Sequence, residues 1–142
     1  MDWLEALGDI NYVGVAVAVL SGFAVGATWY AESVFGKTWM KLVGLKKKDV
    51  ENKEKMMKAM LHTGIGQIIK ACVLASLMLV VGVDGWAEGA LFGAVLALGF
   101  SVTSAAMHDS FAQKSIMLTR LNGAHDIVGV AVMGAIIGGF GF

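Results

Sequence analysis

The sequence predicts an all-α fold, an integral membrane bundle whose four helices each cross the bilayer. Of its 142 residues 57% are hydrophobic and only 15% are charged, and the mean hydropathy is +0.72. Soluble domains carry about 25% charged residues, so the excess of apolar side chains here requires lipid around it. There is no proline, and the 19 glycines are typical of closely packed membrane helices. The length suits a single transmembrane domain, residues 1–142.

Four segments are long and apolar enough to be spans, since about 20 apolar residues cross a hydrocarbon core of about 30 Å. They lie at residues 12–30, 61–82, 88–107 and 124–142. Their apolar runs are continuous and lack the alternation of membrane strands, which favours helices. Ahead of the first span, Trp3 and Leu4 beside Asp2 and Glu5 predict a short interfacial helix.

The basic residues predict an orientation. Ten of the eleven lie in the connections between spans one and two and between spans three and four. The segment before span one and the turn at residues 83–87 have none and carry acidic residues instead. By the positive-inside rule both basic connections face the cytoplasm and both termini face out. Trp29 and Tyr30 then fit as aromatic anchors at the inner boundary.

The connection between the first two spans is predicted to be partly helical. Residues 34–45 mix aromatic and lysine side chains, as in a helix lying on the inner surface. Asp49 is a plausible N-cap for a helix that continues into span two, with Glu54 in its first turns. The lysines here can attract anionic lipid, at about 1 kcal/mol per residue near the surface. The alternative is that they only set topology and solvation.

Small residues four apart occur in three spans, as Gly22 and Gly26, Gly89 to Gly93, and Gly134 to Gly138. Such spacing lets helix backbones approach closely, where van der Waals contact replaces the hydrophobic effect that is absent in lipid. The pattern predicts a tight bundle and leaves open whether the contacts lie within one chain or between chains.

Three stretches resemble a known family. Gly26-Ala27-Thr28-Trp29-Tyr30 followed by residues 35–42 is similar to the first block of the bacterial family called domain of unknown function 1761. Glu88-Gly89 with Gly93, and Asn122-Gly123-Ala124-His125 leading into Gly134, are similar to its other two blocks. Family members often have a proline after the Trp-Tyr pair, where this chain has Ala31-Glu32-Ser33. The resemblance covers nearly the whole chain. It implies a small four-helix protein of a bacterial inner membrane, with no assigned activity.

Polar residues inside the spans are the candidate site, because they are expensive in lipid and often functional. Lys70 lies about nine residues into span two, or roughly 13 Å deep at 1.5 Å per residue. Asp126 is its expected counter-ion, with Asp109 and Glu32 less deep. Helical spacing gathers the candidates in the cytoplasmic half. They are Lys70, Gln67, His62, Asn122, His125, Asp126, His108 and Glu32.

Three hypotheses account for this polar cluster. The residues can cap helices and hydrogen-bond across the bundle, or line a vestibule for an ion, lipid or small polar solute. Alternatively, a metal or haem is ligated by His62, His108 and His125 together with Asp109 or Asp126. No tight His-x-x-x-His spacing supports the metal, and no cofactor is predicted.

Sequence motifs point away from enzyme chemistry, since no nucleophile elbow, phosphate loop or dinucleotide fingerprint is present. Neutral net charge and an apolar composition also make nucleic acid an improbable partner. Four short helices leave little room for an internal pathway. We therefore expect a homo-oligomer or a subunit of a larger membrane complex.

Overall fold

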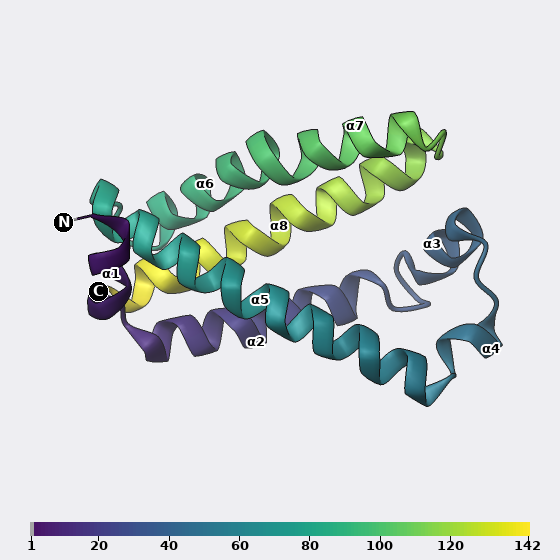
Figure 1. Cartoon of the computed structure of the whole chain (residues 1–142), viewed down its shortest axis with the longest axis horizontal. Coiled ribbons are helices and arrows are strands. Elements are labelled where there is room, and N and C mark those ends of the chain that lie inside the picture. The colour runs from purple at the N-terminus through teal and green to yellow at the C-terminus, as the bar shows by residue number, and fades with distance from the viewer. Residues whose placement is uncertain (1) are drawn as a thin grey trace.

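The computed structural model describes residues 2–142, and within them every regular element is helical (Figure 1). The elements are α1 (Trp3–Asp9), α2 (Tyr12–Trp29), α3 (Gly36–Val43), α4 (Lys47–Val50), α5 (Lys53–Val81), α6 (Trp86–Leu96), the π-helical segment η1 (Ala97–Val102), α7 (Thr103–Phe111) and α8 (Ile116–Phe140). The predicted all-α class, the short N-terminal helix and a partly helical connection between the first two spans are confirmed.

Four helices are long and apolar enough to span a membrane: α2, α5, the continuous α6–η1–α7 rod and α8. Their ends differ from the predicted ones, because α5 and α8 each begin eight residues earlier, at Lys53 and Ile116, and the third rod continues to Phe111. Lysine, glutamate and methionine are good helix formers, so α5 begins ahead of the apolar segment that marks it in the sequence.

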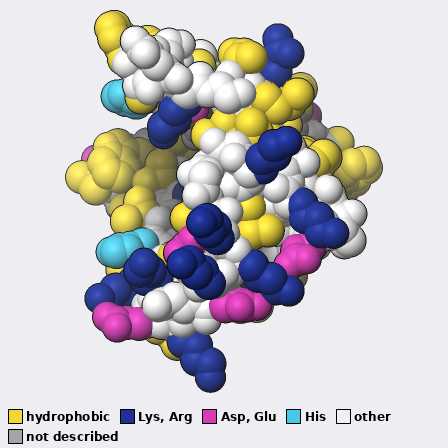
Figure 2. Space-filling model, turned by 90° about the vertical axis from the view of Figure 1, so that its right-hand side faces the viewer, with side chains coloured by type: hydrophobic (Ala, Val, Ile, Leu, Met, Phe, Trp, Pro, Cys, Tyr) yellow, Lys and Arg dark blue, Asp and Glu magenta, His cyan; other side chains and the backbone are white. Residues whose placement is uncertain are grey.

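Charge divides the molecule into two ends. The termini, α1 and the α5–α6 turn lie together at one end, here called the acidic end (Figure 1). The opposite, basic end holds α3, α4 and the α7–α8 turn, and Figure 2 shows its lysine and arginine side chains face on. Ten of the eleven basic residues belong to the basic end, and the eleventh is Lys70 within α5.

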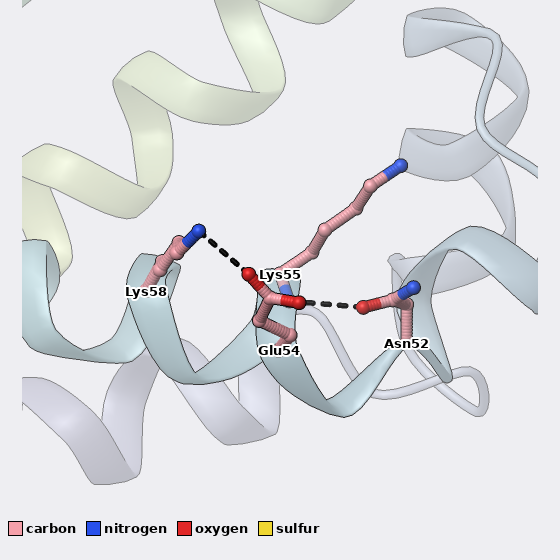
Figure 3. Close-up of polar contacts among 4 residues, drawn as sticks. All are labelled: Asn52, Glu54, Lys55 and Lys58. Atoms are coloured by element: carbon pink, nitrogen blue, oxygen red, sulfur yellow. Dashed lines mark hydrogen bonds and ion pairs between the residues drawn. The ribbon is translucent and has the colours of Figure 1, made fainter.

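The start of α5 corrects one expectation. Asp49 does not cap this helix, because its carboxylate accepts a hydrogen bond from the Lys46 backbone N–H, at 2.9 Å, inside the separate helix α4. The cap is Asn52, whose Oδ1 accepts from the Lys55 N–H at 3.0 Å (Figure 3). Glu54 does stand in the first turn of α5, as predicted.

The α6–α8 pair has the closest packing of the bundle. A Cβ added at Gly89 would overlap the carbonyl of Gly134, and one at Gly93 would overlap the carbonyl of Val130. A Cβ at Gly138 would likewise meet the backbone of Gly85. Only glycine permits this backbone contact. Two of the three small-residue spacings therefore join helices of the same chain.

The apolar core lies toward the acidic end. Ala18 of α2, Leu74 and Met78 of α5, and Met133 and Ile137 of α8 are buried there. Toward the basic end α5 loses this cover, and residues 53–63 are exposed along their whole length. Helix α5 thus leaves the bundle toward the basic end (Figure 1), where α8 keeps its contacts with α2 and α7.

Candidate ligand site between α2 and α8

The C-terminus of α2 meets the first turns of α8 at the basic end. Tyr30 ends α2, with its backbone N–H bonded to the carbonyls of Gly26 and Thr28. Its hydroxyl donates to Oδ1 of Asn122 at 2.8 Å, across 92 residues of sequence. Both partners are half-buried. This bond ties together two of the stretches that carry the family resemblance.

His125 lies at the centre of the site. Its ring contacts Tyr30 at a centroid distance of 5.0 Å and meets the edge of Trp29 at 6.1 Å. Its Nδ1 lies 3.2 Å from Oδ1 of Asp126. If that nitrogen carries the proton, a neutral His125 presents Nε2 as a hydrogen-bond acceptor. With the proton on Nδ1, the carboxylate of Asp126 accepts the hydrogen bond and the opposite ring nitrogen acts as an acceptor.

Two buried polar atoms of the site have no hydrogen-bond partner among residues 2–142. They are Nε2 of His125 and Nε1 of Trp29. A buried polar group without a partner costs about 1–3 kcal/mol, so such atoms are uncommon and each requires an explanation. An indole N–H is a donor only, whereas Nε2 of the tautomer described above is an acceptor. The two requirements are complementary and match a group that both donates and accepts, such as a hydroxyl.

An apolar groove of about 390 Å³ is lined in part by Trp29. Its lining comes from α2, the following turn and α8, and consists of Ala24, Val25, Thr28, Trp29, Val34, Phe35 and Val128. The turn is tight, because a Cβ at Gly36 would overlap the Tyr30 carbonyl. This places Phe35 against Trp29, with ring centroids 4.9 Å apart. Trp29 thus belongs both to the groove wall and to the polar cluster.

The structure brings together part of the predicted cluster. Asn122, His125 and Asp126 are adjacent on α8, as expected from helical spacing. Gln67 contacts α2 at Gly22, one helical turn before the Gly26 position that faces His125. A Cβ added at Gly22 would lie 2.9 Å from the Gln67 side-chain amide. Glu32 is exposed in the turn after α2. Both glycines of the α2 spacing therefore face polar side chains, Gln67 at Gly22 and His125 at Gly26.

The expected ion pair between Lys70 and Asp126 is wrong, since within the described part of the chain Lys70 has no carboxylate within 4.0 Å and Asp126 pairs with His125. The reason is depth. With Gln67 opposite Gly22 in an antiparallel pair, Lys70 lies near the level of residue 19. His125 and Asp126 lie near Gly26. Seven residues of helix separate those levels by about 10 Å.

The described residues of one chain do not form the histidine and carboxylate site that the metal hypothesis requires. Over residues 2–142, no group of three or more His, Cys, Asp or Glu side chains is placed to hold a metal ion. His62 and His108 are exposed on α5 and α7, outside the α2–α8 cluster. Asp109 instead fastens α7 to α8, accepting from the Thr119 hydroxyl at 2.9 Å and pairing with Lys114 at 3.2 Å.

Sequence reasoning missed two members of the site, Trp29 and Tyr30, by reading them only as interfacial anchors. One feature of the sequence could have indicated their role. Tyr30 and Asn122 both lie at the inner boundary of their predicted spans, and thus at similar depths in the membrane, where their side chains can form a hydrogen bond. Packing decides whether an aromatic ring points into the bundle or out to lipid. The sequence pattern alone does not predict this direction.

Comparison with known proteins gives a family and no activity. The family profile described as "Protein of unknown function (DUF1761)" matches residues 13–138. No curated protein and no solved structure matches the chain.

Proposed function

Because the chain belongs to the DUF1761 family, whose description assigns no activity, we propose its function from the site itself: it binds a membrane amphiphile between α2 and α8. The apolar part of this ligand occupies the groove along Ala24, Thr28 and Val128. A hydroxyl head group, which can both accept from Nε1 of Trp29 and donate to Nε2 of His125, lies at these two residues. The protein acts by binding, and no bond of the ligand is made or broken.

Trp29 is the single observation that carries this proposal. Its ring lines the apolar groove, while its Nε1 is buried without a partner among residues 2–142. A ligand with an apolar body and a hydrogen-bonding head fits both properties, as in most small-molecule sites, where a few polar groups orient an otherwise apolar ligand. A free ion or sugar would leave the groove wall without a partner.

The first experiment fills the groove. Purification in mild detergent, followed by mass spectrometry of the bound lipids, identifies the amphiphile that the wild type retains. Ala24→Phe places a large side chain in the groove, so we expect it to lose most of that ligand. Ala16→Phe is the matched control, since Ala16 is exposed on the same helix but outside the groove. Equal ligand retention by all three proteins would reject the site.

A second variant tests the head group. Trp29→Phe keeps an aromatic groove wall and removes the N–H, so we expect affinity for the identified amphiphile to fall by about 1 kcal/mol, which is about fivefold. An unchanged affinity would show that Trp29 contributes only apolar surface. In that case the groove would bind lipid chains without selecting a head group.

The orientation in the membrane is part of the same proposal: the basic end faces the cytoplasm of a bacterial inner membrane, which makes the ligand site inward-facing. Positive-inside bias supports this. In a Cys72→Ala background, Lys47→Cys should resist an impermeant thiol reagent added to intact cells, while Asp84→Cys should react. The reverse pattern would invert the topology and place the site outside.

A further inference from the structure

A second region, at the basic end and away from the groove, has its own unassigned surface. It consists of α4 and the first turns of α5, residues 46–61, and we call it the lysine–methionine segment. At 29 residues α5 is about 43 Å long, which exceeds a hydrocarbon core of about 30 Å. Its N-terminal turns therefore extend into the head-group region at the basic end.

This segment is amphipathic although no other helix covers it. Met56, Met57, Met60 and Leu61 recur at helical spacing, and all are exposed. At 100° per residue they fall within an arc of roughly 140°. Lys55, Lys58 and His62 occupy the opposite side. Helix α4 closes against the methionine side, leaving a groove of about 350 Å³ between Val50, Glu51, Lys53 and the three methionines.

Most of the positive charge on this segment is uncompensated. Of its six lysines, Lys58 pairs with Glu54 at 2.7 Å (Figure 3) and Lys47 with Glu51 at 4.0 Å. Lys46, Lys48, Lys53 and Lys55 have no ion pair within residues 2–142. The third acidic residue, Asp49, is held by the α4 backbone. Figure 2 shows lysine and arginine side chains gathered on the face of the basic end.

We infer that the lysine–methionine segment docks on the anionic lipid head groups of the adjacent leaflet. The four unpaired lysines meet lipid phosphates, and the methionine side with its groove takes the first carbons of the acyl chains. Methionine suits this role because its flexible thioether adapts to irregular apolar partners. Each lysine near an anionic surface strengthens the attraction roughly fivefold. This surface is separate from the α2–α8 site and does not depend on it.

Methionine oxidation provides the test, using the full-length protein in nanodiscs of phosphatidylcholine with or without phosphatidylglycerol. Dilute peroxide converts exposed methionine to its sulfoxide, and peptide mass spectrometry reports each position. We expect anionic lipid to slow oxidation of Met57 at least about threefold, since the segment is drawn into the leaflet. Met107, exposed on α7, serves as the internal reference.

Two charge-matched variants decide the cause. Lys46→Gln/Lys48→Gln/Lys55→Gln should abolish the protection of Met57 by anionic lipid. Lys37→Gln/Lys41→Gln/Arg120→Gln removes the same charge from exposed residues elsewhere at the basic end that form no ion pair within residues 2–142, and it should leave the protection intact. Equal oxidation of Met57 in both kinds of nanodisc, or equal loss of protection in both variants, would overturn the inference.

Discussion

Helix α8 packs in two different ways along its length, and the contrast separates structure from chemistry. Its C-terminal half meets α6 through glycines, so that backbone lies directly on backbone. Its N-terminal half meets α2 through Asn122 and His125, with aromatic rings between the two helices. The first interface has no space for a side chain. The second holds polar groups next to a groove.

This difference separates a rigid glycine interface from the interface that carries the proposed ligand site. Glycine contacts supply van der Waals attraction where lipid removes the hydrophobic effect, and they fix the register of α6 against α8. The N-terminal half of α8 does not take part in this glycine contact. It carries Nε2 of His125, which is buried without a hydrogen-bond partner among residues 2–142. We therefore expect substitutions at the two interfaces to have different consequences.

The largest effect is expected at the glycine interface. Gly89→Ala forces its Cβ into the Gly134 carbonyl, and since backbone cannot rotate away, we expect a loss of about 3 kcal/mol of stability. Gly22→Ala meets only the movable Gln67 side chain and should cost less than about 1 kcal/mol. Gly66→Ala, with open space around it, should stabilise α5 slightly. Unfolding in detergent measures all three. Equal losses would mean that the glycines are not packing sites.

The next contrast lies inside the polar half. Asp126→Asn removes the carboxylate that orients His125, so we expect a loss of about 1 kcal/mol and weaker ligand binding. Lys70→Leu should leave stability unchanged or raise it, because in the described residues no carboxylate depends on Lys70. Melting temperature and ligand retention of both variants provide the check. Equal losses of stability and ligand retention in both variants would instead support the hypothesis that Lys70 and Asp126 act together in one vestibule.

A somewhat smaller effect is expected where α2 is tied to α8. Tyr30→Phe keeps the ring against His125 and removes the hydrogen bond to Asn122, which we expect to cost about 0.5–1 kcal/mol. Asn122→Ala should give a similar loss, and the double variant should cost little more than either single one. Fully additive losses would show that the two side chains act independently.

The smallest effect is expected at the surface ion pair between Glu54 and Lys58. Both side chains are more than two-thirds exposed, so Glu54→Gln should change stability by only about 0.4 kcal/mol. Asn52→Ala, which removes the N-cap of the same helix, should cost about 1 kcal/mol. A shift of melting temperature larger for Glu54→Gln than for Asn52→Ala would contradict this order.

Composition, hydropathy and glycine spacing were sufficient to predict the helical class, the four long apolar helices and their close packing, because each depends on local sequence. Asn122, His125 and Asp126 were found for the same reason, since neighbours on one helix keep their spacing in any fold. That Lys70 does not pair with Asp126 could not be predicted in this way. Helical periodicity assigns a residue to a face of its own helix, whereas the depth of a residue on another helix depends on how the two helices are staggered. The number of chains in an oligomer stays a prediction.

The π-helical turn at Ala97–Val102 sets the angular phase of the third rod. In an uninterrupted α-helix the 16 residues from Gly93 to Asp109 would rotate Asp109 roughly 160° away from the glycine side. The wider turn absorbs about one residue and reduces that angle to roughly 60°. Gly93 and Asp109 can then both contact α8, at Val130 and Thr119. Deleting one residue from this turn would therefore leave a regular α-helix that keeps both contacts, whereas inserting one residue into α7 would rotate Asp109 back to roughly 160° and away from α8.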